Sequence, residues 1–374
     1  MRIVHPTANL PLPCREQHNL GAVDIMSIYD TFLFADPSER EVLLAKLNIE
    51  SELVSHWFIV DSAFSNTGKF KGHHVRGVLD HPDFSKFQSR ITVIEYDENF
   101  FSNSQRRQGI ERNFLTDQIS YGLGRFSRFA RHQAHYLRKA TQLKSVTQFL
   151  AYLYDERFRH DNRTYMRTET FYRDLSRKAI LDFVGDDDFL FISDVDEILD
   201  AQTPSCKNSL LELTNAGGKY KLMRLVKRKR LWDWNNLDTS SFSYVPLVSG
   251  SYIRKNPNFK FNLIRQTQNA VTPFSPLELV HEYSSCYPME GLLAKYSYHV
   301  DLSFTQKEEL ELSLKLNKNV GMPGLKPNGW LEFVPLELDH QPEYVKNNFS
   351  NLSTGLVDKD YRENRTKYFP ELFN

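Results

Sequence analysis

The amino-acid sequence predicts an α/β protein built on a Rossmann-like, mostly parallel sheet with a helical insertion. Two observations support this class. Short, almost entirely apolar runs alternate with helical segments over the first hundred residues, which is typical of strands buried on both faces by helices. A basic, aromatic block at 101–167 then interrupts the alternation. The chain has 374 residues, enough for one or two domains with a substantial core.

The first half predicts the order β-α-β-α-β. A buried strand is expected within 22–34, and a helix follows over 37–53. Residues 56–62 predict the second strand, 83–88 a helical segment and 90–97 the third strand. The helix over 37–53 has an apolar face at helical spacing, formed by Val42, Leu43, Ala45, Lys46, Leu47 and Ile49.

The second half begins with a helix over 171–184, which a turn at 185–188 ends before another apolar strand. Alternating polarity over 219–265 indicates a few antiparallel strands, and 305–319 is expected to be helical. The expected domain organisation is a flexible N-terminal arm over 1–20, a main domain over 21–345 that contains the basic helical insertion 101–167, and a polar C-terminal tail over 346–374.

The charge balance limits the classes of partner. Lys and Arg together number 47, as do Asp and Glu, and zero net charge argues against a dedicated nucleic-acid binder. The block 101–167 is an exception, with thirteen Lys and Arg against five Asp and Glu. It is interpreted either as a surface for an acidic acceptor, a membrane or RNA, or as a solvated helical face balanced by acids elsewhere.

Three widely spaced cysteines indicate neither a disulfide framework nor a zinc site. The first twenty residues do not resemble a signal peptide, and no apolar run has the length of a membrane span. The chain as written is therefore expected to be soluble and to have no transmembrane segment, unless an anchor lies outside the printed residues.

Three carboxylates follow directly on an apolar run in FLFISDVDEILD, residues 189–200. Residues i and i+2 of a strand point to the same side. Asp194 and Asp196 are thus expected to aim at one point beyond the carboxyl end of a parallel strand, where open α/β sheets bind ligands. Two such carboxylates suit Mg²⁺ or Mn²⁺, which commonly carries substrate phosphates. The alternative is a strand end with solvated acids paired to Lys or Arg.

A second enzyme class shares the apolar strand that ends in D-x-D. In phosphatases of the haloacid-dehalogenase type the first aspartate is the nucleophile, so Asp194 would be phosphorylated and Asp196 would act as general acid. The pattern of that class continues with Gly-Thr, whereas this chain has Glu197 and Ile198. The sequence also offers no convincing Asp-Asp pair on a later strand.

Four stretches in the same order resemble glycosyltransferase family 17, the family of β-1,4-mannosyl-glycoprotein 4-β-N-acetylglucosaminyltransferases. They are IYDTFLFADPSEREVLLAKL at 28–47, FIVDSAFSNTGKFK at 58–71, DDDFLFISDVDEIL at 186–199 and VHEYSSCYPMEGLLAKYSYH at 280–299. A weaker fifth match is PEYVKNN at 342–348. Together the stretches frame most of the chain.

The chain also departs from the family pattern. Asp61 replaces a Glu, Leu199 replaces a Pro, and Val280 and Ser285 replace the two Trp residues beside the His and Cys of the fourth stretch. The block 101–167 is longer than the usual connection. The transfer chemistry is compatible with these changes, whereas the choice of acceptor is not carried over. A catalytically inactive sugar-binding relative is a further hypothesis.

The resemblance implies an A-type glycosyltransferase fold and an inverting transfer assisted by Mn²⁺ or Mg²⁺. The donor it implies is a nucleotide sugar, with UDP-GlcNAc first, and the acceptor is a glycan or glycoprotein, as in N-glycan processing. Animal members are anchored in the Golgi membrane. The location of this chain is therefore open between the cytoplasm and, with an anchor outside the printed residues, the Golgi lumen.

The resemblance also assigns site residues. Asp196 is implied as the principal metal ligand, Asp194 as a ligand of the metal or of the donor ribose, and His281 as a second protein ligand of the metal. The alternative for His281 is a core or surface histidine. Lys295 and Arg173 are implied to neutralise the departing diphosphate. Their alternatives are a solvated surface lysine and a helix-face ion pair.

Asp61 lies at the end of the second strand, where such folds hold the nucleotide base, and its alternative is a helix or turn cap. An inverting transfer also needs a general base that activates the acceptor hydroxyl. The candidates are Asp233, Glu282 and Asp301, with Glu197 a poorer one if it braces the site. Trp232 and Trp234 are either sugar-stacking platforms or core residues.

Overall fold

The computed structural model describes residues 2–4, 26–65, 70–97, 171–215, 221–238, 243–256, 261, 274–298, 307–317, 331–335 and 340–368. The basic insertion expected at 101–167 and the greater part of the arm expected at 1–20 lie outside these residues. The fold described below is that of the remaining chain.

The described strands form one mixed sheet of eleven strands, in the order β1-β4-β3-β2-β5-β9-β7-β10-β6, with β8 and β11 paired off this path. The strands are β1 (Arg2–Val4), β2 (Ile28–Phe34), β3 (Val54–Ser62), β4 (Ile91–Tyr96), β5 (Phe189–Ile192), β6 (Glu197–Leu199), β7 (Leu222–Leu231), β8 (Asn236–Leu237), β9 (Ser243–Ser249), β10 (Phe274–Ser284) and β11 (Glu332–Phe333).

Four central strands, β4, β3, β2 and β5, are mutually parallel. The chain enters this group at β2, moves through β3 to β4 on one side, and later returns to β5 on the other side of β2. The direction of strand order therefore reverses between β2 and β5. In open α/β sheets, ligands bind at the carboxyl ends of the strands at such a reversal. This topology confirms the predicted Rossmann-like α/β class.

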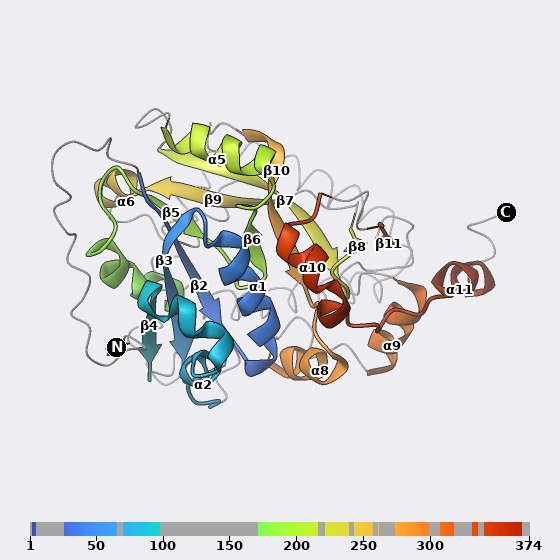
Figure 1. Ribbon diagram of the computed structural model, residues 1–374. Coiled ribbons are helices and arrows are strands. Elements are labelled where there is room, and N and C mark those ends of the chain that lie inside the picture. The colour runs from blue at the N-terminus through green and yellow to red at the C-terminus, as the bar shows by residue number, and fades with distance from the viewer. Residues whose placement is uncertain are drawn as a thin grey trace, which may run out of the picture.

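Helices cover the parallel strands on both faces. The helices are η1 (Pro37–Glu39, a 3-10 helix), α1 (Arg40–Glu50), α2 (Val75–Leu79), η2 (Pro82–Arg90, a 3-10 helix), α5 (Pro204–Asn215), α6 (Gly250–Lys255), α8 (Met289–Tyr298), α9 (Lys307–Leu316), α10 (Glu343–Leu352) and α11 (Tyr361–Tyr368), and residues 171–181 are also helical. Figure 1 shows α1 and α2 together on one side of β2, β3 and β4.

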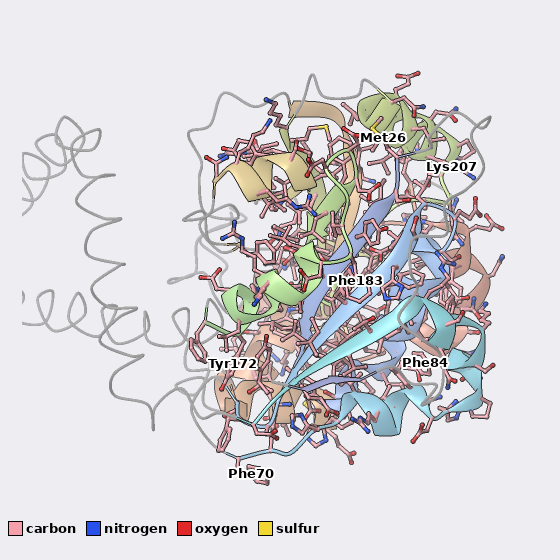
Figure 2. The ribbon with its side chains drawn as sticks, turned by 90° about the vertical axis from the view of Figure 1, so that its left-hand side faces the viewer. Met26, Phe70, Phe84, Tyr172, Phe183 and Lys207 are labelled. Carbon is pink, nitrogen blue, oxygen red and sulfur yellow. The ribbon has the colours of Figure 1, made fainter. Side chains whose placement is uncertain are left out.

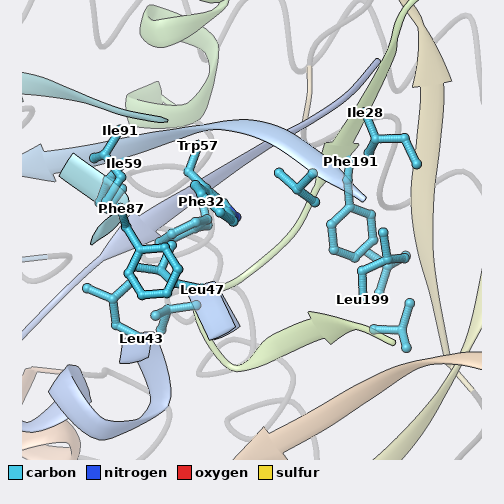
Figure 3. Close-up of a cluster of buried hydrophobic side chains, with 14 of the residues drawn as sticks. Ile28, Phe32, Leu43, Leu47, Trp57, Ile59, Phe87, Ile91, Phe191 and Leu199 are labelled. Atoms are coloured by element: carbon cyan, nitrogen blue, oxygen red, sulfur yellow. The ribbon is translucent and has the colours of Figure 1, made fainter. Parts of the chain in front are cut away.

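The alternation of side chains along β3 divides the core into two layers. Trp57 and Ile59 belong to the cluster that contains α1, α2 and η2, whereas Phe58 packs with the helix over 171–181. Figure 3 shows the first layer, with side chains of α1 against Trp57 and Ile59. Figure 2 shows Phe84 and Tyr172 on opposite sides of the strands. Burial on both faces explains why these strands are almost entirely apolar.

Both expected termini differ from the structure. Residues 2–4, expected in a flexible arm, form strand β1 antiparallel to β4. The expected polar tail over 346–374 contains the greater part of α10 and all of α11, which bury Leu352 and Tyr361 in the core shared with α1. The expected boundary between 345 and 346 lies inside α10, because α10 places apolar residues on one helical face despite its polar composition.

The sheet continues beyond the parallel strands with charged antiparallel strands. β7 and β9 pair antiparallel, as predicted for 219–265. β10 then pairs parallel to β7 and antiparallel to β6. Among the helices of the described residues, none combines the length and the apolar character that a membrane crossing requires.

Candidate functional site

The D-x-D motif lies in the turn between β5 and β6, at the reversal of strand order. β5 ends at Ile192, which pairs with Thr31 of β2, and the N–H of Ser193 donates to the carbonyl of Thr31 at 3.1 Å. Asp194 and Asp196 follow in the turn before β6. Their location beyond the carboxyl end of a parallel strand is as predicted. The strand alternation invoked to align them does not apply, because the strand has already ended.

Glu197 braces this turn. Its backbone N–H donates to the carbonyl of Asp194 at 3.0 Å, and one of its carboxylate oxygens accepts the N–H of Asp194 at 2.8 Å. Its other oxygen lies 2.7 Å from the ammonium of Lys227, and the side chain is 1% exposed. A carboxylate with these partners fixes the backbone of the motif. Glu197 was expected to be a poorer general base if it braced the site, and these contacts show that it does so.

Arg173 pairs with the first aspartate of the motif. Its guanidinium hydrogen-bonds the carboxylate of Asp194 and donates to the carbonyl of Ser193 at 2.5 Å. The Arg173 side chain is 3% exposed, whereas that of Asp194 is 36% exposed. Arg173 thus lies at the predicted edge and forms the predicted alternative, an ion pair, while Asp194 remains accessible to a ligand.

The stretch 280–299 packs directly against the motif. The N–H of Tyr283 in β10 donates to the carbonyl of Asp196 at 2.8 Å. α8 follows β10 and lies against η1, where a Cβ on Gly291 would come within 2.8 Å of the Cβ of Ser38. Figure 1 shows α8 beside the amino end of α1, the end that follows β2 in the chain. The backbone of Lys295 is therefore on a helix at this edge, and its side chain lies outside the described part of the chain.

Glu282 lies opposite Glu197 in the β6–β10 pair and shares the ammonium of Lys227, which is 2.6 Å from it. Its other oxygen accepts the hydroxyl of Ser284 at 2.5 Å. Burial opposes its ionisation, but Lys227 and Lys229 outweigh burial and lower the pKa of Glu282 to about 2. A carboxylate so stabilised accepts a proton weakly, which weakens the case for Glu282 as the general base.

His281 is buried and bonded at both ring nitrogens. Nδ1 lies 2.8 Å from the Arg230 guanidinium and Nε2 lies 2.9 Å from the Asp200 carboxylate. Arginine can only donate, so Nδ1 is the acceptor and Nε2 carries the proton given to Asp200. Burial opposes ionisation of Asp200, but hydrogen bonding to His281 lowers its pKa below the usual range. As placed, His281 is a core histidine, and metal ligation would require one of these bonds to break.

Asp61 is fully buried at the end of β3, opposite Phe34 of β2. One carboxylate oxygen lies 3.2 Å from the ammonium of Lys71. The other accepts the backbone N–H groups of His74 and Val75, at 2.8 and 3.0 Å. The carboxylate therefore caps the start of α2, which is the alternative that the sequence had left open.

The remaining candidates either have structural roles or lie outside the described residues. Asp233 accepts the Ser353 hydroxyl at 2.9 Å and the Trp234 N–H at 2.7 Å, so it holds the chain that follows α10. Trp232 and Trp234 are each 1% exposed and form core, so neither offers a face to a sugar. Asp301 lies outside the described residues. None of these was distinguishable from a site residue by sequence pattern alone.

The two carboxylates at the turn are of the chemical type that a hard divalent cation takes, one on the accessible Asp194 and one on the buried Asp196. Asp194 and Asp196 supply carboxylate oxygens, the ligands that Mg²⁺ and Mn²⁺ prefer. Within the described ranges, no three side chains of His, Cys, Asp and Glu gather into a group that could hold a metal ion. Magnesium in proteins is commonly held by one or two carboxylates and substrate phosphates, which matches these two aspartates.

Four stretches that are far apart in the sequence meet around this turn. Strand pairing joins 28–47 to 58–71 through β2 and β3, and to 186–199 through β2 and β5. The stretch 280–299 joins 186–199 through β10 and β6, and joins 28–47 through α8 and η1. No protein-family model matches the chain, and neither the curated proteins nor the solved structures give a match.

Proposed function

We propose that the protein is a metal-dependent, inverting glycosyltransferase of the A-type fold that transfers N-acetylglucosamine from UDP-GlcNAc to a glycan acceptor. The observation that supports this most is the meeting of four family-like stretches around Asp194 and Asp196 at the reversal of strand order. The resemblance to glycosyltransferase family 17 suggests the reaction and the donor, and the reversal of strand order is a position at which open α/β sheets bind ligands, which supports the proposal.

The chemistry needs positive charge where the sugar–phosphate bond breaks. A Mg²⁺ or Mn²⁺ held by Asp196 and Asp194 would stabilise the negative charge that develops on the leaving diphosphate. The backbone of Lys295 is on α8 at the same edge, which supports its implied role as a second cation. The Arg173 guanidinium is bonded to Asp194, so its first task is to orient that carboxylate.

The carboxylates and lysines behind the turn keep this arrangement in place. Glu197 fixes the backbone of the motif, and Lys227 links Glu197 to Glu282 across β6 and β10. An orientation held by such contacts before the substrate binds lowers the reorganisation that the reaction requires. The general base is left unassigned, because Glu282 holds protons weakly and Asp233 caps another segment.

The test is UDP release from UDP-GlcNAc, measured with and without Mn²⁺, for the wild type and two variants. Asp196→Asn removes the charge of the principal ligand and is expected to lower metal-dependent release by about 100-fold, the usual scale for losing one electrostatic contact to a transition state. Asp186→Asn is the matched control, because Asp186 precedes β5 at its amino end and pairs with Arg254. It is expected to leave release unchanged.

Three outcomes would contradict the proposal. One is equal release in the presence and absence of metal. Another is the absence of both release and metal-dependent UDP binding with UDP-GlcNAc, UDP-Gal and UDP-Glc. The third is a phosphorylated Asp194 formed from a phosphate ester, which would establish the phosphatase mechanism. Binding of UDP and sugar without turnover would instead identify a non-catalytic relative.

A further inference from the structure

A second charged cluster lies beneath the turn, in a fully buried site that the reaction above does not use. The Lys46 ammonium lies 2.8 Å from the Asp30 carboxylate and 3.0 Å from that of Glu50, and all three side chains are 0% exposed. The rings of Phe32 and Phe191 lie within 5.3 Å of the same ammonium. The site is thus closed to bulk solvent and lined in part by aromatic rings.

The same ammonium contacts both ends of the D-x-D turn. It donates to the hydroxyl of Ser193 at 3.1 Å and to the carbonyl of Glu197 at 2.5 Å. Ser193 in turn donates to Asp30 at 2.8 Å. Asp194 and Asp196 lie between the two residues that Lys46 holds. One side chain of α1 therefore fixes where the turn begins and where it ends.

Glu50 extends the cluster to two further strands. One of its oxygens accepts the backbone N–H of Leu199 in β6 at 2.9 Å, and the other accepts the Trp57 indole N–H of β3 at 2.9 Å. The cluster therefore connects α1 to β2, β3, β6 and the end of β5. Of these elements, β2 and β5 flank the reversal of strand order.

Stability alone does not explain such a cluster. Replacing a buried ion pair by apolar side chains of similar volume is often neutral or stabilising, because the desolvation of charge opposes the attraction. A lysine has three hydrogens that must point at fixed acceptors, whereas an apolar side chain would pack without setting any direction. The cluster therefore supplies orientation to the groups that it contacts.

We propose that Lys46 is a positioning residue of the donor site, which sets the arrangement of Asp194 and Asp196 by tying Ser193 and Glu197 to α1. This inference rests on the proposed function. Lys46 does not touch substrate or metal in this role. Its removal acts on the coordination of the metal through the turn, as the loss of an outer-shell partner does.

The experiment compares two folded variants at the same number of degrees below their own melting temperatures. The triple variant Asp30→Asn, Lys46→Met, Glu50→Gln replaces all three ionisable side chains by neutral ones, so none of them is left as an unpaired buried charge. The control is Arg365→Met. Arg365 is also buried and donates to the carbonyls of Leu316 and Leu331 in the C-terminal part.

Two readouts are taken from each variant. Hydrogen–deuterium exchange over 190–199 is expected to be about tenfold faster in the triple variant, because the turn opens locally more often. The affinity for Mn²⁺ in the presence of UDP, measured by calorimetry, is expected to fall by about 10–100-fold. Arg365→Met is expected to change neither quantity.

The outcomes separate the inference from the proposed function. Unchanged exchange and unchanged Mn²⁺ affinity in the triple variant would overturn the inference while leaving the donor site intact. Equal changes in Arg365→Met would also overturn it, because the effect would then be general destabilisation. If the wild type binds no Mn²⁺ with UDP, the proposed function fails first, and Lys46 loses its role at a donor site even if exchange accelerates.

Discussion

Two lysines from different elements hold the same turn, and their surroundings differ. Lys46 reaches it from α1 beneath, and Lys227 reaches it from β7. Each ammonium contacts two carboxylates, those of Asp30 and Glu50 for the first and those of Glu197 and Glu282 for the second. The side chain of Lys46, called here the inner lysine, is 0% exposed. That of Lys227, the outer lysine, is 11% exposed. The inner cluster is Lys46 with Asp30 and Glu50, and the outer cluster is Lys227 with Glu197 and Glu282. Each lysine thus faces two carboxylates, whereas its access to water differs.

The pKa values of two glutamates, one from each cluster, are shifted in opposite directions. Burial, with the nearby Asp30 charge, raises the pKa of Glu50 to about 8 despite the attraction of Lys46. The pKa of Glu282 is lowered to about 2, because a second lysine adds to the attraction of Lys227 and outweighs burial. The comparison teaches that the ratio of lysines to carboxylates and the access of water together decide whether a buried acid keeps its charge.

The largest effect is expected from removing the inner lysine alone. Lys46→Met leaves two carboxyls in a dry site without their cation, and breaking a buried ion pair in this way costs about 3–5 kcal/mol. Urea denaturation monitored by circular dichroism measures the loss of unfolding free energy. A loss below about 1 kcal/mol would contradict the ionic contacts described for α1.

A smaller effect, of the order of 1–3 kcal/mol, is expected from titrating Glu50. Between its unfolded pKa of 4.5 and its folded pKa of about 8, the folded state holds a proton that the unfolded state has released. Unfolding then releases a proton, so this contribution to stability is lost as pH rises through that window. Glu50→Gln is expected to remove this loss in urea titrations at pH 5 and 8.

The titration of Glu282 is expected to change the free energy of unfolding with pH in the opposite direction. Its folded pKa of about 2 lies below the unfolded value of 4.5, so unfolding takes up a proton between these values. Its contribution to stability is therefore lost as pH falls from 4.5 to 2. Glu282→Gln is expected to reduce the dependence of the unfolding free energy on pH only at acid pH, between about 2 and 4.5. If both variants reduce it over the same pH range, the contrast between the two clusters is wrong.

Replacing the outer lysine, Lys227, is expected to lower the free energy of unfolding by less than replacing the inner lysine, Lys46. Lys227→Met is expected to destabilise the protein by about 2 kcal/mol, below the usual range for a broken buried pair. Glu197 keeps its bond from the Asp194 N–H, and Lys229 lies 3.7 Å from Glu282. The same urea titration measures this loss, and a loss equal to that of Lys46→Met would show that burial does not separate the two clusters.

The smallest effect is expected at an exposed pair. Lys207 and Glu52 lie 2.5 Å apart with side chains 35% and 50% exposed. Lys207→Met is expected to cost less than about 1 kcal/mol, because solvent screens such pairs. This variant calibrates the denaturation series, and a cost comparable with that of Lys227→Met would remove the distinction between buried and exposed lysines.

The sequence predicted the parallel half of the fold well. The strands expected at 56–62 and 90–97 are β3 and β4. They are apolar on both faces, and this property can be seen in a few consecutive residues of the sequence. The expected helix over 37–53 is η1 followed by α1. Lys46 was already counted on the apolar face of that helix, and the structure buries it there. A lysine on an apolar face, four residues before a glutamate, was the signal for the inner cluster.

The site was predictable in place and not in detail. The position of Asp194 and Asp196 at the carboxyl end of a strand followed from a local apolar run. The partners of His281 and Asp61 did not follow, because Arg230, Asp200 and the start of α2 reach them only through the tertiary fold. Strand pairings and caps between distant residues leave no local pattern, so site and structural carboxylates look alike in sequence.

The most direct test of the account is the position of Mn²⁺ in a crystal of the protein grown with UDP, located by anomalous scattering at the manganese edge. The account predicts one strong peak within coordination distance of the Asp196 carboxylate, with the UDP diphosphate completing the coordination. A peak elsewhere on the chain, or UDP bound away from the turn between β5 and β6, would contradict the assignment of this edge as the donor site.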